Sequence, residues 1–130
     1  KRRFNRRQSA VFAENEHRLN EERVVVVMVG LPARGKSFIS NALLRYLKFL
    51  GCQASMFNAG NLRREAGNAG ASADFFDPSN SAGKQQREEA AMQCLESCID
   101  FLKAQMGCAA IGILDATNTT FERRCKVHDR

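Results

Sequence analysis

The sequence predicts an α/β fold in which helices flank a parallel β-sheet. Two continuous apolar runs, residues 24–29 and residues 109–114, are typical of strands that are buried on both faces, as in parallel sheets. Between these runs, apolar residues recur at helical spacing over two long stretches, and this alternation of strand and helix builds such a sheet. A chain of 130 residues is long enough for one domain with one hydrophobic core.

A glycine-rich loop follows the first strand directly. Residues 30–37 read GLPARGKS and fit G-x-x-x-x-G-K-[ST], the phosphate-binding P-loop, which predicts a P-loop NTPase-type sheet. The glycines let backbone N–H groups close around a phosphate, and the next helix directs its positive end toward it. Lys36 can reach the outer phosphates and the Ser37 hydroxyl can ligate Mg²⁺, whereas a simple glycine turn leaves both unexplained. The predicted nucleotide-binding set is Gly30, Leu31, Pro32, Ala33, Arg34, Gly35, Lys36, Ser37 and Phe38.

The chain after the P-loop alternates between helix and strand. Apolar spacing predicts a helix over residues 36–50, which Gly51 is expected to end. Residues 53–57 predict a short second strand, and residues 58–61 a turn-rich loop at its carboxyl end, where open α/β sheets place ligands. Arg63 is expected to begin a short helix or turn immediately beyond this loop.

A long helix and a third strand follow. Residues 75–78 predict a hydrophobic anchor and a helix entry, and an apolar stripe over residues 84–106 predicts a long helix that Gly107 ends. Residues 109–114 predict the third strand, and a further helix is expected to start at Phe121. Because P-loop kinase sheets usually have about five parallel strands, we expect an incomplete sheet made of the first three.

An acidic residue ends the third predicted strand. Asp115 stands where P-loop proteins carry the Walker B acid, which holds Mg²⁺ directly or through water beside the P-loop hydroxyl of Ser37. A second interpretation stays open, in which Asp115 caps the turn that follows. The first interpretation predicts that Lys36 and Asp115 act together in catalysis.

Basic and hydroxyl side chains are expected at the same edge of the sheet. Arg64 follows the second strand, and its planar guanidinium suits a second phosphate, although exposed arginines are more often only solvated. Arg87 lies toward this edge if the long helix crosses back in right-handed fashion. Thr117 and Asn118 can bond an acceptor hydroxyl or phosphate, and Arg123 lies one to two helical turns further on.

Net charge, apolar runs and cysteine spacing indicate which class of protein this is. The net charge of +6 favours small anionic substrates, because no basic stripe interleaved with aromatic residues indicates nucleic acid. No apolar run approaches the ~20 residues of a membrane span, and no secretory signal is recognisable, so a cytosolic protein without a membrane partner is expected. The five cysteines include no C-x-x-C pair and suit free, reduced thiols, with a zinc site around Cys94 and Cys98 as the alternative.

Residues 1–23 predict a polar, basic extension that precedes a domain over residues 24–130. Within it, R-R-Q-S at residues 6–9 resembles the R-R-x-S pattern that basophilic protein kinases favour. Phosphorylation of Ser9 would place roughly two negative charges among arginines and would change how the extension docks. The alternative is a solvated tail without regulation.

Four motifs together resemble the kinase domain of the 6-phosphofructo-2-kinase/fructose-2,6-bisphosphatase family. They are GLPARGKS at residues 30–37, FNAGNLRRE at 57–65, FF at 75–76 and DATNTTFERR at 115–124, in the family's order and spacing. The resemblance implies transfer of the ATP γ-phosphoryl group to the 2-hydroxyl of fructose 6-phosphate, with Mg²⁺, in a full-length homodimer. It also implies roles for individual residues: Lys36 and Asp115 in catalysis, Ser37 and Asp115 at the metal, and Arg64, Arg87, Thr117 and Arg123 at the sugar phosphate.

The sequence departs from the family in three places. Ser37 stands where many members have threonine, which keeps the hydroxyl, and the loop at residues 67–74 is slightly shorter than in the family. The family's later strands and its bisphosphatase domain are missing, so a fragment that is inactive or poorly stable in isolation is expected. Two other functions stay open: a different P-loop kinase, such as a polynucleotide 5′-hydroxyl kinase, and a nucleotide-binding regulator without turnover.

Overall fold

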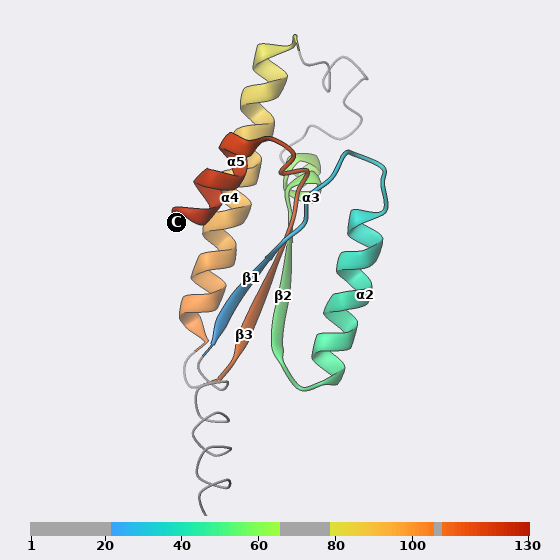
Figure 1. Cartoon of the computed structure of the whole chain (residues 1–130), viewed down its shortest axis with the longest axis vertical. Coiled ribbons are helices and arrows are strands. Elements are labelled where there is room, and N and C mark those ends of the chain that lie inside the picture. Colours follow the sequence, from blue (N-terminus) through green and yellow to red (C-terminus); the bar gives the residue numbers. More distant parts are fainter. Residues whose placement is uncertain (1–21, 66–78, 106–107) are drawn as a thin grey trace, which may run out of the picture.

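The computed structural model describes residues 22–65, 79–105 and 108–130, and Figure 1 shows the whole chain. The predictions for Ser9, for residues 75–78 and for Gly107 lie outside these ranges. The described elements are β1 (Arg23–Val27), α2 (Lys36–Phe49), β2 (Gln53–Asn58), α3 (Ala59–Arg63), α4 (Ser81–Ala104), β3 (Ala110–Asp115) and α5 (Phe121–His128).

The three strands form one parallel sheet in the order β1-β3-β2. In this register Val27 and Phe57 both lie beside Leu114, and Asn58 lies beside Asp115. The predicted parallel sheet of three strands flanked by helices is therefore confirmed. Because all carboxyl ends meet at one edge, the P-loop, the end of β2 and the end of β3 lie next to one another.

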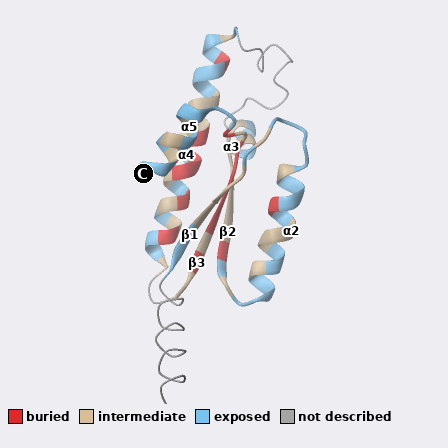
Figure 2. Cartoon of the chain, viewed as in Figure 1, coloured by how far each residue is buried: buried red, intermediate tan, exposed pale blue. Residues whose placement is uncertain are grey.

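Helices cover both faces of the sheet (Figure 1). Helix α2 packs against β2 and β3 on one face, and α4 packs against the same two strands on the other. The buried residues concentrate on α4 and β3 (Figure 2), where Leu95 and Leu114 are in one core cluster. A Cβ atom added to Gly112 would lie 2.2 Å from the Cys98 sulfur, so glycine permits this close approach of α4 to the sheet.

Polar caps decide where the helices begin. Helix α4 starts three residues before the predicted position, because the Asn80 side chain accepts a hydrogen bond from the backbone N–H of Gly83 at 2.8 Å. The predicted loop at residues 58–61 is wrong, since α3 begins there with Asn58 as its cap, accepting from the N–H of Asn61 at 2.8 Å. Glycine and asparagine are weak helix formers, so the sequence of α3 resembled a turn. Helix α2 ends as predicted, with Gly51 at φ 81°.

The predicted apolar stripe of α2 is only partly buried. Leu43 and Leu47 are half-buried, whereas Ile39, Tyr46 and Leu50 are each more than half exposed. The reason is that α2 packs mainly on β2, an edge strand of this three-stranded sheet, so the sheet covers only part of its apolar stripe. None of the helices within the described ranges is long and apolar enough to span a membrane.

Candidate active site

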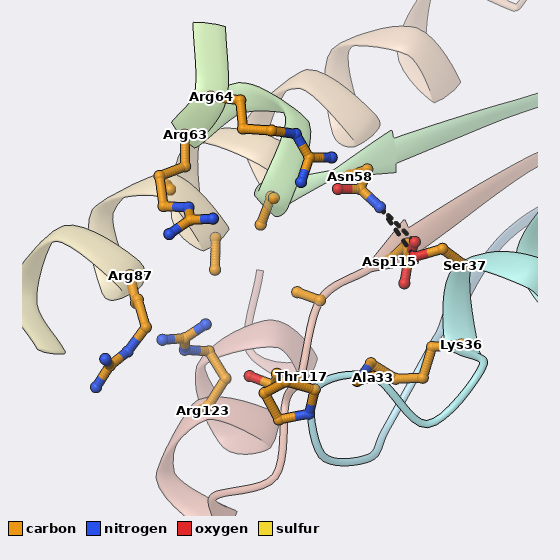
Figure 3. A pocket seen from close by; sticks show the side chains of 16 residues that line it. Ala33, Lys36, Ser37, Asn58, Arg63, Arg64, Arg87, Asp115, Thr117 and Arg123 are labelled. Atoms are coloured by element: carbon orange, nitrogen blue, oxygen red, sulfur yellow. Dashed lines mark hydrogen bonds between the residues drawn. The ribbon is translucent and has the colours of Figure 1, made fainter. Parts of the chain in front are cut away.

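A cavity of about 270 Å³ opens at the carboxyl edge of the sheet. The P-loop, α3, α4, the end of β3 and α5 all contribute to its walls (Figure 3). Its lining is Pro32, Ala33, Lys36, Ser37, Asn58, Ala59, Gly60, Arg63, Arg64, Arg87, Ala90, Ala91, Asp115, Ala116, Thr117 and Arg123.

The P-loop curls around the Lys36 side chain. The Lys36 ammonium donates a hydrogen bond to the Leu31 carbonyl at 2.6 Å, which spans the loop. Ala33 and Gly35 adopt left-handed backbone conformations, with φ 55° and 78°, and Gly35 begins α2 without a side-chain cap. The first N–H groups of α2 therefore face the loop, an arrangement that favours an anion.

The structure places the predicted nucleotide-binding residues in two groups. Four of them line the cavity: Pro32, Ala33, Lys36 and Ser37. The other five do not line it: Gly30, Leu31, Arg34, Gly35 and Phe38. Phe38 is 76% exposed at the start of α2, so its side chain contributes no wall.

Asn58 connects the P-loop to the end of β3. Its amide nitrogen donates to the Asp115 carboxylate and, at 3.3 Å, to the Ser37 hydroxyl (Figure 3). Asp115 is 3% exposed and therefore keeps a fixed position beside the hydroxyl. Sequence analysis missed Asn58, because its place opposite Asp115 depends on the strand order and on the register.

The oxygens of Ser37 and Asp115 are of the kind that Mg²⁺ prefers. Within the described ranges, no group of three or more His, Cys, Asp or Glu side chains is arranged to hold a metal alone. Magnesium fits such a sparse site, since it usually takes one or two protein ligands together with substrate phosphates and water. The zinc alternative has no such cluster in the described part of the chain, where Cys94 and Cys98 are buried among apolar residues.

Arg63, Arg87 and Arg123 lie across the cavity from Lys36 and Asp115, and Arg64 lies beside Asn58 (Figure 3). Arg63 and Arg64 come from the end of α3, Arg87 from α4 and Arg123 from α5. The predicted substrate residues Arg64, Arg87, Thr117 and Arg123 thus all line one cavity. Arg63 was missed, because the helical geometry that brings both neighbouring arginines to the cavity was not apparent from the sequence.

Arg64 and Arg123 are held by side chains of the protein. Arg64 donates to the Asn61 side chain, one helical turn away. Arg123 donates through Nε to a Glu88 carboxylate oxygen at 2.8 Å, and through Nη2 to the same oxygen. Burial acts to raise the pKa of Glu88, but the hydrogen bonds and charges of Arg123 and Lys126 together outweigh it and lower that pKa. Glu88 is consequently ionised at neutral pH.

Asn118 does not face the cavity. It is 1% exposed, and its amide donates to the Met28 carbonyl at 2.9 Å. Its φ of 45° is a left-handed conformation that asparagine tolerates better than most residues. The Asn118–Met28 hydrogen bond and a 2.9 Å hydrogen bond from the Gly30 N–H to the Thr117 carbonyl together hold the turn after β3 against the P-loop. The interpretation of Asn118 as a substrate ligand is replaced by this structural role.

Comparison with known proteins identifies the family to which this chain belongs. The family model described as 6-phosphofructo-2-kinase matches residues 13–130 of this chain. The chain belongs to the 6-phosphofructo-2-kinase family. This confirms the resemblance inferred from the four motifs, and it assigns the P-loop and the DATNTTFERR segment to the same kinase family.

Individual relatives agree with this membership. The chain is 47% identical over 105 residues to a 6-phosphofructo-2-kinase/fructose-2,6-bisphosphatase from Caenorhabditis elegans, covering 77% of this chain and 22% of the relative. It is 44% identical over 110 residues to a probable 6-phosphofructo-2-kinase from Schizosaccharomyces pombe, covering 84% and 16% respectively. The chain thus spans about a fifth of the length of the curated relatives it matches.

A solved structure supports the fold. An APS kinase mutant from Mycobacterium tuberculosis superimposes with a TM-score of 0.52, covering 82% of this chain and 66% of that chain. The two sequences are 23% identical, so the match indicates a shared P-loop kinase fold and carries nothing about the substrate. The predicted fold class agrees with this neighbour.

Proposed function

We propose that the full-length protein transfers the γ-phosphoryl group of ATP to the 2-hydroxyl of fructose 6-phosphate and forms fructose 2,6-bisphosphate. Membership of the 6-phosphofructo-2-kinase family supports the reaction. The observation that carries the proposal is a single cavity with a phosphate-binding loop on one side and arginines on the other. Two phosphate-bearing substrates need this arrangement, one at each side.

The P-loop side of the cavity suits the nucleotide. The Lys36 ammonium would exchange its bond to the Leu31 carbonyl for contact with the outer phosphates, where it neutralises charge that moves during transfer. Ser37 and Asp115 would hold Mg²⁺ there, and the bound ion supplies further positive charge to the phosphates. Asn58 keeps the Asp115 carboxylate turned toward the Ser37 hydroxyl.

The arginine side of the cavity suits the sugar phosphate. Arg64, Arg87 and Arg123 present planar guanidinium groups that bind phosphate through paired hydrogen bonds. Thr117 lies between the two sides in Figure 3, where its hydroxyl can bond an oxygen of the acceptor. Holding the 6-phosphate at the arginines would direct the rest of the sugar toward the P-loop.

Alignment and charge are expected to supply most of the rate acceleration. Among the described residues that line the cavity, Asp115 is the one carboxylate, and its near neighbours are the oxygens and amide of the predicted metal site. Phosphoryl transfer needs little covalent assistance from the protein, because positioning and electrostatic stabilisation dominate. The absence of a dedicated base from this lining therefore agrees with the proposal.

Acceptor specificity tests the proposed function. The full-length protein is incubated with ATP labelled at the γ-phosphate and either fructose 6-phosphate or a 5′-hydroxyl oligonucleotide, and labelled products are separated. We expect label in the sugar bisphosphate alone. Label in the oligonucleotide would favour a polynucleotide kinase, and ATP binding without transfer to either acceptor would favour a silent regulator. The homodimer, the cytosolic location and phosphorylation of Ser9 stay predictions.

A further inference from the structure

Glu88 lies outside the predicted site, but it contacts the Arg123 guanidinium directly. Both Arg123 nitrogens that it engages, Nε and Nη2, donate to one oxygen of the Glu88 carboxylate. The two residues come from different helices, α4 and α5, and they are separated by 35 positions in the sequence. The Arg123 side chain is 12% exposed and the Glu88 side chain 32%, so the contact is partly shielded from water.

The geometry leaves part of Arg123 available for a ligand. A guanidinium carries five N–H donors in one plane, and Glu88 takes those on the edge formed by Nε and Nη2. Within the described ranges, Nη1 of Arg123 donates no hydrogen bond to another side chain. A phosphate can therefore bind at the Nη1 end of Arg123 while the Glu88 contact remains intact.

The charge balance around Glu88 also permits an anion. Lys126 on α5 approaches the second oxygen of the Glu88 carboxylate at 3.4 Å, so one carboxylate stands against two cations. Lys126 also pairs with Glu122 at 2.9 Å, so the two carboxylates and two cations of this cluster carry no net charge. Arg63, Arg64 and Arg87 line the same cavity as Arg123, and their positive charges attract a phosphate to it.

We infer that Glu88 is a positioning residue that holds Arg123 in the orientation required to bind the phosphate of the sugar substrate. An arginine without such a partner loses side-chain conformational freedom when the substrate binds, and this entropy cost weakens binding. Glu88 fixes the side chain beforehand, so that less freedom is lost on binding. The inference rests on the proposed function, since it concerns the acceptor of that reaction.

Two substitutions of Glu88 test this role in the full-length protein. Glu88→Ala removes both hydrogen bonds and should raise the KM for fructose 6-phosphate by about tenfold, as expected for charge-assisted bonds that orient a ligand group. Glu88→Gln keeps an acceptor oxygen without the charge and should raise the KM for fructose 6-phosphate by only about threefold. The KM for ATP and kcat should stay within about twofold, because the P-loop side is not changed.

Glu96→Ala is the matched control. Glu96 on α4 also forms an ion pair, with Arg130 just beyond α5 at 3.0 Å, but Arg130, unlike Arg123, does not line the cavity. Loosening α4 against α5 in general would affect both variants equally, so an unchanged KM in Glu96→Ala assigns the effect to Arg123. A decrease in KM for Glu88→Ala would overturn the inference, because it would mean that Glu88 competes with the phosphate.

A double-mutant cycle decides whether Glu88 acts through Arg123. We expect Arg123→Ala to raise the KM for fructose 6-phosphate and to abolish any further effect of Glu88→Ala. Fully additive effects of the two substitutions would overturn the inference, since Glu88 would then influence the sugar by another route. Circular dichroism and thermal unfolding of each variant verify that it is folded.

The wild-type protein separates this inference from the proposed function. If it transfers no phosphate to fructose 6-phosphate, the proposed function is wrong. Binding of inorganic phosphate to the same variants is then measured by isothermal titration calorimetry. Weaker binding in Glu88→Ala than in Glu96→Ala would support the positioning role, and equal affinities would overturn it.

Discussion

The two sides of the cavity are built in different ways. The P-loop side consists mainly of one short segment, where Lys36 contacts Leu31, five positions away. The arginine side comes from three helices, and Arg123 is held by Glu88, 35 positions away. Local sequence therefore determines the first side, whereas the second exists only when the helices have packed against the sheet.

This difference suggests how the two sides divide the work. A locally determined phosphate cradle suits the part of the reaction that many kinases share, namely holding and neutralising the nucleotide. The arginine side, which is built from three helices, suits the part of the reaction that differs between kinases, namely recognition of the acceptor. Substitutions on the P-loop side should lower kcat for any acceptor, whereas substitutions on the arginine side should raise the KM for the sugar phosphate.

Lys36→Met should have the largest effect. The substitution removes the ammonium that lies within the P-loop while keeping a side chain of similar length, so that charge on the transferred phosphoryl group is no longer neutralised. We expect kcat to fall on the order of 10³-fold, measured as label transfer from ATP. Lys48→Met, on the exposed last turn of α2, is the control. An active Lys36→Met protein would mean that the P-loop side does not serve the nucleotide.

Asn58→Asp tests the connection between the P-loop and β3. Aspartate caps helices as well as asparagine does, so α3 should keep its start, but the donor to Asp115 and Ser37 is replaced by a second carboxylate. We expect kcat to fall by about 10- to 100-fold, and the Mg²⁺ concentration for half-maximal activity to change.

Asn80→Asp is the matched control for this experiment. Asn80 caps α4 with the same side-chain contact, and it does not line the cavity. Its kinetics should equal those of the wild type. If Asn58→Asp shows wild-type kcat and Mg²⁺ dependence, the bridge between Ser37 and Asp115 has no part in the reaction.

Arg64→Lys tests the arginine side with a smaller change. Lysine keeps the positive charge but loses the planar fork, and it also loses the contact to Asn61. The KM for fructose 6-phosphate should rise by about tenfold while the KM for ATP stays constant. Arg45→Lys, on the exposed surface of α2, should leave both constants unchanged. A rise in the KM for ATP alone would place Arg64 on the nucleotide side instead.

Sequence analysis predicted the features that depend on short segments. Patterns within about ten residues predict the P-loop, the strand that ends at Asp115 and the glycine that follows α2. Asn58 and Glu88 were missed for a physical reason, since nothing in their own neighbourhood shows which side chains lie opposite them. Their contacts depend on strand order, register and helix packing, which a single sequence does not encode in a local pattern.

The smallest expected effect concerns pH and again distinguishes the two sides. The pKa of Glu88 is lowered from its ordinary value of 4.5, because the hydrogen bonds and charges of Arg123 and Lys126 together outweigh its burial. Glu88 therefore stabilises the folded protein fully above pH 4.5, and this contribution is lost as the pH falls through the lower folded-state pKa. The bond that Lys36 donates on the P-loop side is to the Leu31 carbonyl and not to a carboxylate.

Thermal unfolding of the wild type and Glu88→Gln between pH 7 and pH 3 measures this contribution. Glutamine does not titrate, so the difference in Tm should be about a few degrees at neutral pH and should close below pH 4.5. A difference in Tm that stays constant down to pH 3 would show that the Glu88 charge does not stabilise the contact with Arg123, and the arginine side would then be held by packing alone.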